Sequence, residues 1–204
     1  AAYGQGVVAR LHGYEIFNGE FVKMLRKAVA WEKVFALVVV SKHIKRVVYD
    51  RIGDVLKDQT KLLVVPNGVD MTKYTFRHHS SGSNVAFVCG LDPYVKGMHF
   101  LPMYLRALVE RDPDVVIRIA CPTEVFAYSD VGMAVQEEVR ALNLDGHLVC
   151  DGWQEDMNAW LEDKDWFLSL SIRESFGYAL AEAMTKGIKP LILNRPGAVE
   201  MWPE

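Results

Sequence analysis

Short β-branched runs alternate with longer amphipathic segments along the second part of the chain. The periodicity predicts strands at 85–89, 115–120, 147–150, 166–171 and 190–193, and helices at 98–111, 131–142, 155–161 and 176–186. Strands that alternate with helices form βαβ units, whose parallel sheet is covered by helices on both faces. The sequence therefore predicts an α/β fold with a doubly wound parallel sheet. Right-handed crossovers bring the carboxyl ends of the strands to one edge, where such sheets bind ligands.

The first 65 residues show the same alternation on a smaller scale. Strands are predicted at 7–11, 36–40 and 62–65, and helices at 20–33 and from the N-cap Ser41 to about Arg51. The turn Pro66-Asn67-Gly68 and the polar residues 78–84 follow. These boundaries predict a partial α/β domain at 1–65, a linker at 66–84 and a second α/β domain at 85–204.

Charge is divided unevenly between the two parts of the chain. Residues 1–80 hold 13 Lys and Arg against 7 Asp and Glu, a net of +6, whereas 81–204 hold 10 against 19, a net of −9. The split fits two units with different partners, and it equally fits two solvated surfaces of one body. Over all 204 residues the net charge is −3, which argues against a dedicated nucleic-acid binder.

Composition narrows the class of protein further. Half of the residues are hydrophobic, yet no apolar run approaches the roughly 20 residues of a membrane span. Cys89, Cys121 and Cys150 are odd in number and contain no CxxC pair, so neither a disulfide framework nor a thiolate zinc site is expected. A reducing, cytoplasmic compartment fits this cysteine usage. The chain lacks an initiator Met and ends without a predicted closing helix, so we treat it as a piece of a longer protein.

The loop after strand 85–89 carries a first candidate binding feature. It contains Gly90, Lys96 and Gly97 directly before a helix. Free amides at a helix start, together with an ammonium group, suit a phosphate. In the alternative interpretation, Lys96 is simply an exposed lysine at a helix start without a ligand. The GxxxxGK[ST] pattern of a Walker A loop is absent from the sequence.

The loop after strand 166–171 carries a second candidate binding feature. Gly177 would let a ligand approach the helix amides, so residues 175–178 could hold a pyrophosphate. Glu174 precedes the helix and Glu182 lies about two turns further on, so both carboxylates can line one cleft. In the alternative interpretation, Glu174 interacts with the helix dipole and Glu182 is solvated. Alanines, a leucine and a methionine surround Glu182, and a carboxylate there is costly to bury unless it accepts hydrogen bonds.

Two features of the N-terminal part allow two interpretations each, and a histidine pair in the linker allows one. His12 follows a strand and is either a proton shuttle or a packed histidine. The basic amphipathic stretch 20–33 either packs on its own sheet or contacts an anionic membrane surface. His78 and His79 lack acidic or cysteine neighbours at metal-ligand spacing, so no metal site is expected there.

Taken together, these motifs resemble the retaining, nucleotide-sugar-dependent glycosyltransferases of family four, which have the GT-B fold. The resemblance centres on the Glu-x7-Glu motif from Glu174 to Glu182, within Ser171-x-x-Glu174-x-Phe176-Gly177. Further matches are Lys96-Gly97, Pro66-Asn67-Gly68-Val69-Asp70, Leu11-His12-Gly13 and Pro196-Gly197-Ala198-Val199-Glu200. The resemblance implies that 85–204 is a Rossmann-like donor domain, truncated at its C-terminus, and that 1–65 is the end of the acceptor domain.

The resemblance also implies roles for individual residues. Glu174 and His12 would lie at the reacting centre. The donor-binding residues would be Gly90, Lys96, Gly97, Arg173, Ser175, Phe176, Gly177 and Glu182. Lys96 would neutralise the donor diphosphate, the amides near Phe176 and Gly177 would hold it, and Glu182 would accept from the ribose. No metal and no cofactor would be needed, because lysine, arginine and the helix dipole stabilise the leaving diphosphate.

Two departures from the family pattern bear on this site. The family's Gly-Arg-Leu is Gly90-Leu91-Asp92 here, so the arginine that accompanies Lys96 is absent and Arg173 is a candidate substitute. The usual glycine-rich loop after the third strand is Cys121-Pro122-Thr123, which alters the expected nucleobase pocket.

The expected function is transfer of a hexose from a nucleoside diphosphate sugar to a glycan or lipid-linked acceptor, with retention, in surface polysaccharide assembly. The alternatives are a non-catalytic nucleotide- or glycan-binding module, a nucleotide-sugar epimerase and a phosphorylase. Expected partners are the nucleotide-sugar donor, the acceptor and the inner face of the membrane, but no nucleic acid.

Overall fold

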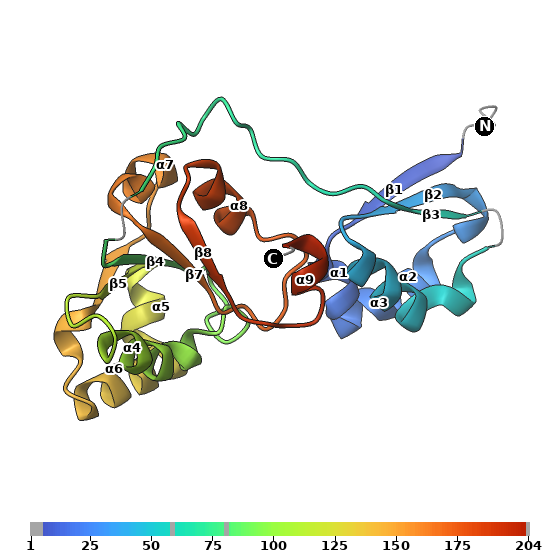
Figure 1. Ribbon diagram of the computed structural model, residues 1–204. Coiled ribbons are helices and arrows are strands. Elements are labelled where there is room, and N and C mark those ends of the chain that lie inside the picture. Colours follow the sequence, from blue (N-terminus) through green and yellow to red (C-terminus); the bar gives the residue numbers. More distant parts are fainter. Residues whose placement is uncertain (1–5, 58–59, 80–81, 203–204) are drawn as a thin grey trace. The chain divides into compact units, whose positions relative to one another are not determined.

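The computed structural model describes residues 6–57, 60–79 and 82–202 (Figure 1). It divides into two compact units. The N-terminal unit comprises residues 1–68 with 174–176 and 196–204, and the C-terminal unit comprises 69–173 with 177–195. Each unit contains its own parallel sheet, so both parts of the chain are α/β as expected.

The N-terminal unit is built on a three-stranded sheet in the order β1-β2-β3. Its strands are β1 (Val7–Leu11), β2 (Val34–Val39) and β3 (Lys61–Val64), and its first helices are α1 (Gly13–Phe17), α2 (Gly19–Ala28) and α3 (Lys42–Ile52). All three helices lie on the same face of the sheet (Figure 1). Ser41 caps α3 as predicted, since its Oγ accepts a hydrogen bond from the amide of Ile44 at 3.1 Å.

The prediction of one helix over 20–33 is wrong in its second half. Helix α2 ends at Ala28, and a 3-10 turn, Trp31–Lys33, follows. Val29 adopts an extended conformation, which lets the indole of Trp31 turn back and donate to the carbonyl of Leu25 at 2.9 Å. Burying this large side chain and pairing its N–H outweighs one further turn of helix.

The C-terminal unit is a five-stranded parallel sheet with helices on both faces. Its strands are β4 (Asn84–Val88), β5 (Val116–Ala120), β6 (Leu148–Gly152), β7 (Trp166–Ser169) and β8 (Lys189–Ile192). Its helices are α4 (Leu101–Val109), α5 (Thr123–Tyr128), α6 (Asp130–Ala141), α7 (Met157–Trp160) and α8 (Tyr178–Thr185). Helices α4 and α6 cover one face of the sheet, and α7 and α8 lie on the other (Figure 1).

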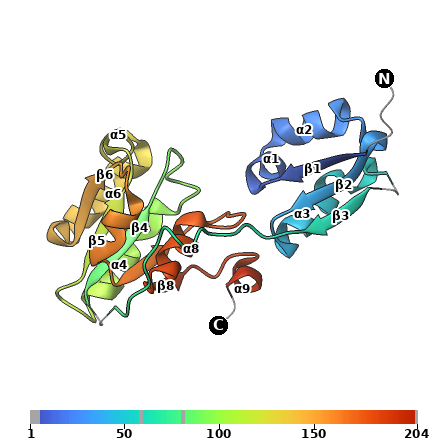
Figure 2. The same cartoon turned by 90° about the horizontal axis from the view of Figure 1, so that it is seen from above.

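The strand order of this sheet is β6-β5-β4-β7-β8, and all four pairings are parallel (Figure 2). Strands β5 and β6 therefore lie on one side of β4, and the later strands β7 and β8 lie on its other side. This confirms the predicted doubly wound sheet. The direction of winding changes between β4 and β7, and sheets of this kind bind ligands beside such a switch point.

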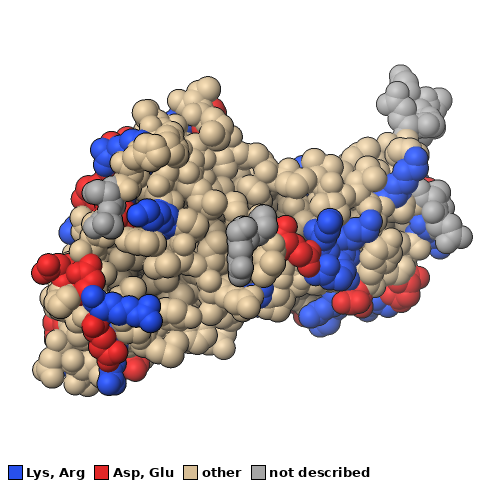
Figure 3. All heavy atoms as spheres, in the orientation of Figure 1, with Lys and Arg blue, Asp and Glu red and all other residues tan. Residues whose placement is uncertain are grey.

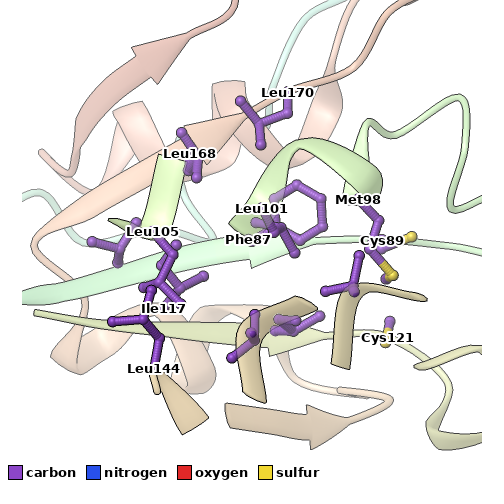
Figure 4. Close-up of a cluster of buried hydrophobic side chains, with 14 of the residues drawn as sticks. Phe87, Cys89, Met98, Leu101, Leu105, Ile117, Cys121, Leu144, Leu168 and Leu170 are labelled. Carbon is purple, nitrogen blue, oxygen red and sulfur yellow. The ribbon is translucent and has the colours of Figure 1, made fainter. Parts of the chain in front are cut away.

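The hydrophobic core of this unit lies between the sheet and the helices α4 and α6. Phe87, Ile117 and Leu168 from the strands pack with Leu101 and Leu105 from α4 (Figure 4). These side chains are almost fully shielded from solvent. The packed core holds the strand ends, and thus the loops that follow them, in fixed positions.

Three short helices, α1, α5 and α9 (Ala198–Met201), were not expected from the sequence. Helix α5 follows β5, and α9 follows β8, where the sequence predicted no closing helix. Among the described residues, none of the helices is long and apolar enough to cross a membrane.

Candidate functional site

The loops after β4 and β7 meet at the switch point of the sheet. The amide of Ile172 donates to the carbonyl of Val95 at 2.9 Å, which joins the two loops directly. Gly97 has a φ of +75°, and a Cβ there would stand 2.0 Å from the carbonyl oxygen of Leu170. Only glycine fits this left-handed, crowded position. The two loops that carry the sequence-predicted binding residues are thus one packed unit.

The loop after β4 presents Gly90 and Lys96 at this edge. An added Cβ at Gly90 would meet no heavy atom within 4 Å, so a ligand can approach its backbone. The carboxylate of Asp92 accepts from the amide of Val95 at 3.0 Å, and the amide of Lys96 donates to the carbonyl of Asp92 at 3.1 Å. This turn fixes the backbone of Lys96, whose side chain is partly exposed.

The loop after β7 leads into helix α8. Gly177, with a φ of +90°, is its N-cap residue and offers no side chain to the helix amides. Such an N-terminus, with its partial positive charge, suits an anion. Arg173 is exposed in the same loop, and Leu91, at the position of the family's arginine, is 84% exposed.

Glu182 lies one turn into α8, partly buried. Burial, followed by a hydrogen bond to Glu182, raises the pKa of Tyr74 to about 12. Tyr74 is therefore a neutral donor at physiological pH, and the carboxylate of Glu182 accepts a hydrogen bond from its hydroxyl group. The expected embedded carboxylate is thus satisfied by a hydrogen bond, and it has further lone pairs for another donor.

A cavity of about 420 Å³ opens beside Glu182. It is lined by Lys73 and Tyr74, by residues 155–158, which lead into α7, and by Glu182. All of these residues belong to the C-terminal unit. Apart from Glu182, the sequence motifs pointed to none of them, because the lining comes from three segments that are far apart along the chain.

An ion pair between buried Lys186 and half-exposed Glu162 supports one wall of this cavity. Lys186 is only 1% exposed, and its ammonium donates to Asn158 Oδ1 and to Glu162 Oε2, each at 2.6 Å. Arg77 pairs with the same carboxylate, its Nη1 lying 2.9 Å from Glu162 Oε1. The hydrogen bond from Lys186 is the main reason why the pKa of Glu162 is held below its usual range. The network fastens the segment after β3 to α7 and α8.

The remaining predicted residues belong to the N-terminal unit. His12 follows β1 directly, and the carboxylate of Glu15 accepts from its amide at 2.9 Å. A Cβ on Gly13 would lie 2.8 Å from Cβ of Ser175, so the start of α1 touches the segment 174–176 within this unit. His12 and Glu174 are thus each adjacent in sequence to a residue of this contact.

Basic side chains gather on the N-terminal unit, with acidic ones beside them, on the face seen in Figure 3. The exposed basic residues on its helices are Lys23, Arg26, Lys27, Lys42, Arg46 and Arg51. Three of them are paired with carboxylates, Lys23 with Glu20, Arg26 with Asp54 and Arg46 with Glu200. In the part of the chain that the structure describes, no group of three or more His, Cys, Asp or Glu could hold a metal ion.

The fold, with its two parallel sheets, is that of an α/β protein of the GT-B class. Residues 82–202 match the family model described as glycosyl transferases group 1, and the chain belongs to this family. Two curated relatives are named GDP-mannose:cellobiosyl-diphosphopolyprenol alpha-mannosyltransferase. The protein from Xanthomonas oryzae pv. oryzae is 30% identical over 145 residues, and that from Xanthomonas campestris is 28% identical over 145 residues. The match covers 71% of this chain but only 38% of either relative.

Solved structures of GT-B glycosyltransferases share the fold. Anabaena Alr3699/HepE, solved in complex with UDP and glucose, has a TM-score of 0.72 at 20% identity and is covered to 54%. TarM has a TM-score of 0.70 at 16% identity and is covered to 36%. The matches cover 96% and 93% of this chain, respectively. The predicted GT-B fold and the predicted family are therefore confirmed.

Proposed function

We propose that the protein containing this chain transfers a hexose from a nucleoside diphosphate sugar to a lipid-linked glycan acceptor, with retention at the anomeric carbon. The observation that carries the proposal is the joined pair of loops after β4 and β7, with Lys96 in one and, in the other, the N-terminus of α8, which no side chain caps. The names of the two Xanthomonas relatives support a polyprenyl diphosphate acceptor.

In this proposal the donor diphosphate binds between Lys96 and the amides at Phe176 and Gly177. The ammonium and the helix dipole stabilise the negative charge that grows on the diphosphate as it leaves. Arg173, exposed beside them, supplies a second cation in place of the missing arginine. Glu182 accepts from the ribose hydroxyls with the oxygen atoms that Tyr74 leaves available.

The reaction breaks the bond between the anomeric carbon and the diphosphate oxygen, and forms a bond from the same carbon to the acceptor oxygen. The proton of the acceptor hydroxyl passes to the departing diphosphate oxygen on the same face of the sugar. Glu174 positions the sugar, and His12 binds on the acceptor side. Both roles are electrostatic and orienting, so no dedicated protein base is required.

The test is sugar transfer by the full-length protein from GDP-, UDP- or ADP-hexoses to polyprenyl diphosphate glycans in isolated membranes. Lys96→Ala and Glu182→Ala are expected to reduce transfer at least about 100-fold, since each removes a charged donor or acceptor at the proposed site. Arg106→Ala, which removes an exposed arginine on α4, serves as the matched control and should leave transfer unchanged.

A second candidate, a binding module without catalysis, is favoured by Leu91 at the arginine position. It predicts nucleotide binding that Lys96→Ala weakens, with no transfer to any acceptor. Product analysis also separates the epimerase and the phosphorylase. An epimerase would change the donor sugar without an acceptor, and a phosphorylase would require free phosphate.

A further inference from the structure

The cavity beside Glu182 has the dimensions and the chemistry of a base-binding pocket. Its volume of about 420 Å³ lies within the usual range of ligand sites. Glu182, in the second turn of α8, lines the cavity, and the first turn of the same helix is the proposed diphosphate site. Tyr178 and Glu182 are four residues apart, or about 6 Å along the helix axis. A nucleoside diphosphate whose ribose meets Glu182 would therefore place its base in this cavity, an inference that rests on the proposed function.

The side-chain amide of Asn158, in one wall of the cavity, is held in a fixed orientation. An ammonium group has donors only, so the 2.6 Å contact between Lys186 and Asn158 must involve the amide oxygen of Asn158. The amide nitrogen, with two N–H donors, is left for other partners. Because Lys186 is buried and also bonded to Glu162, this orientation is held firmly.

The loop before α7 offers acceptors to the same cavity. Asp156 uses its Oδ1 to cap α7, accepting from the amide of Ala159 at 3.0 Å. Its neighbour Glu155 is exposed and lines the cavity as well. The carboxylate of Glu155, unlike that of Asp156, does not cap α7.

We propose that this cavity recognises guanine, with Glu155 accepting from N1–H and the 2-amino group and Asn158 donating to O6. Guanine presents one acceptor followed by two donors along its Watson–Crick edge, which matches one amide donor and one carboxylate. Uracil presents a single donor between two acceptors, and the carboxylate would repel both carbonyls. Adenine has one amino donor and a ring acceptor, and it offers nothing to the second carboxylate oxygen. Glu155 is therefore the residue that determines donor specificity, and Lys186 is a positioning residue that acts through Asn158.

The experiment measures binding of GDP, IDP, UDP and ADP to the full-length protein by calorimetry. IDP lacks only the 2-amino group, so the ratio of IDP to GDP dissociation constants reports that contact alone. We expect GDP to bind most tightly, and about ten-fold more tightly than IDP. In Glu155→Ala the IDP to GDP ratio should fall towards one, whereas Asp156→Asn, which retains the helix cap, should preserve it. Lys186→Met should reduce the preference for GDP over UDP, a change that simple destabilisation would not produce.

The outcomes separate this proposal from the proposed function. Tight binding of UDP or ADP with weak GDP binding, or an unchanged IDP to GDP ratio in Glu155→Ala, overturns the guanine assignment and leaves glycosyl transfer standing. Absence of binding by all four nucleotides, in protein that unfolds cooperatively, overturns both. Selective loss of guanine discrimination in Glu155→Ala, with UDP affinity unchanged, supports the assignment.

Discussion

Gly97 lies directly against the backbone carbonyl of Leu170, so closely that a Cβ would stand 2.0 Å from the oxygen. The contact joins the loop after β4 to the loop after β7 at the switch point of the sheet. Neither partner can retreat easily, because Leu170 is buried in the core and Met98, next to Gly97, is also buried. The arrangement of the proposed donor site thus depends on the absence of one side chain.

Gly97→Ala should therefore destabilise the protein. The substitution adds a clash with backbone and forces alanine to a φ of +75°. We expect the free energy of unfolding to fall by about 2 kcal/mol or more. Urea denaturation checks the value. Gly146→Ala, which meets nothing within 4 Å and has no positive φ, is the control. Equal stability of the two variants would contradict the close approach.

Gly90→Ala, in contrast to Gly97→Ala, should affect nucleotide binding but hardly change stability. The position is open and its backbone is not left-handed, so stability should change by no more than about 0.5 kcal/mol. If the diphosphate passes over this backbone, the added methyl group should weaken nucleotide binding about ten-fold. Calorimetry alongside thermal unfolding separates the two effects. Unchanged binding would place the diphosphate elsewhere.

Much of this fold follows from local sequence signals. Strand β1 and the Ser41 cap of α3 lie where they were predicted, because β-branched runs and hydroxyl caps act over a few residues. Helices α1 and α5, of five and six residues, were missed. Helices of this length are not stable alone and depend on packing by the rest of the unit.

The candidate site was only partly accessible from sequence. The loops with Lys96 and Gly177 stood out because glycine and charge occur together before a helix. Tyr74 and Asn158 did not stand out, because only the tertiary fold brings them to the cavity beside Glu182. A lysine such as Lys186 gives no sign in the sequence that it is buried, since burial depends on distant partners.

The ion pair between Glu162 and Lys186 should make stability depend on pH. The pKa of Glu162 is lowered in the folded state, mainly by its hydrogen bond from Lys186. The stabilisation is therefore fully present above the unfolded-state pKa of about 4.3, and it is lost as the pH falls through the lower folded-state value. Glu162→Gln should lower stability only modestly at pH 7, because the carboxylate is half exposed and its charge is screened by solvent.

The measurement is the melting temperature of wild type and Glu162→Gln between pH 3 and pH 7. The difference between them should shrink as the pH falls below about 4. Glu137→Gln, on the exposed face of α6, controls for the change in net charge. A difference that is constant across this range would mean that the charge of Glu162 contributes nothing.

Burial of their thiols should protect Cys89 and Cys121 from alkylation. Burial raises the pKa of Cys89 to about 12, and it raises the pKa of Cys121 further. Only the thiolate reacts with alkylating agents, so at pH 8 both thiols should react with iodoacetamide about a thousand-fold more slowly than an ordinary cysteine. Mass spectrometry of native protein, compared with protein in urea and with free glutathione, gives the rates. Cys121 and Cys150 lie with their sulfur atoms 3.8 Å apart, so labelling of Cys121 at the rate of glutathione would mean that this end of the sheet opens readily to solvent.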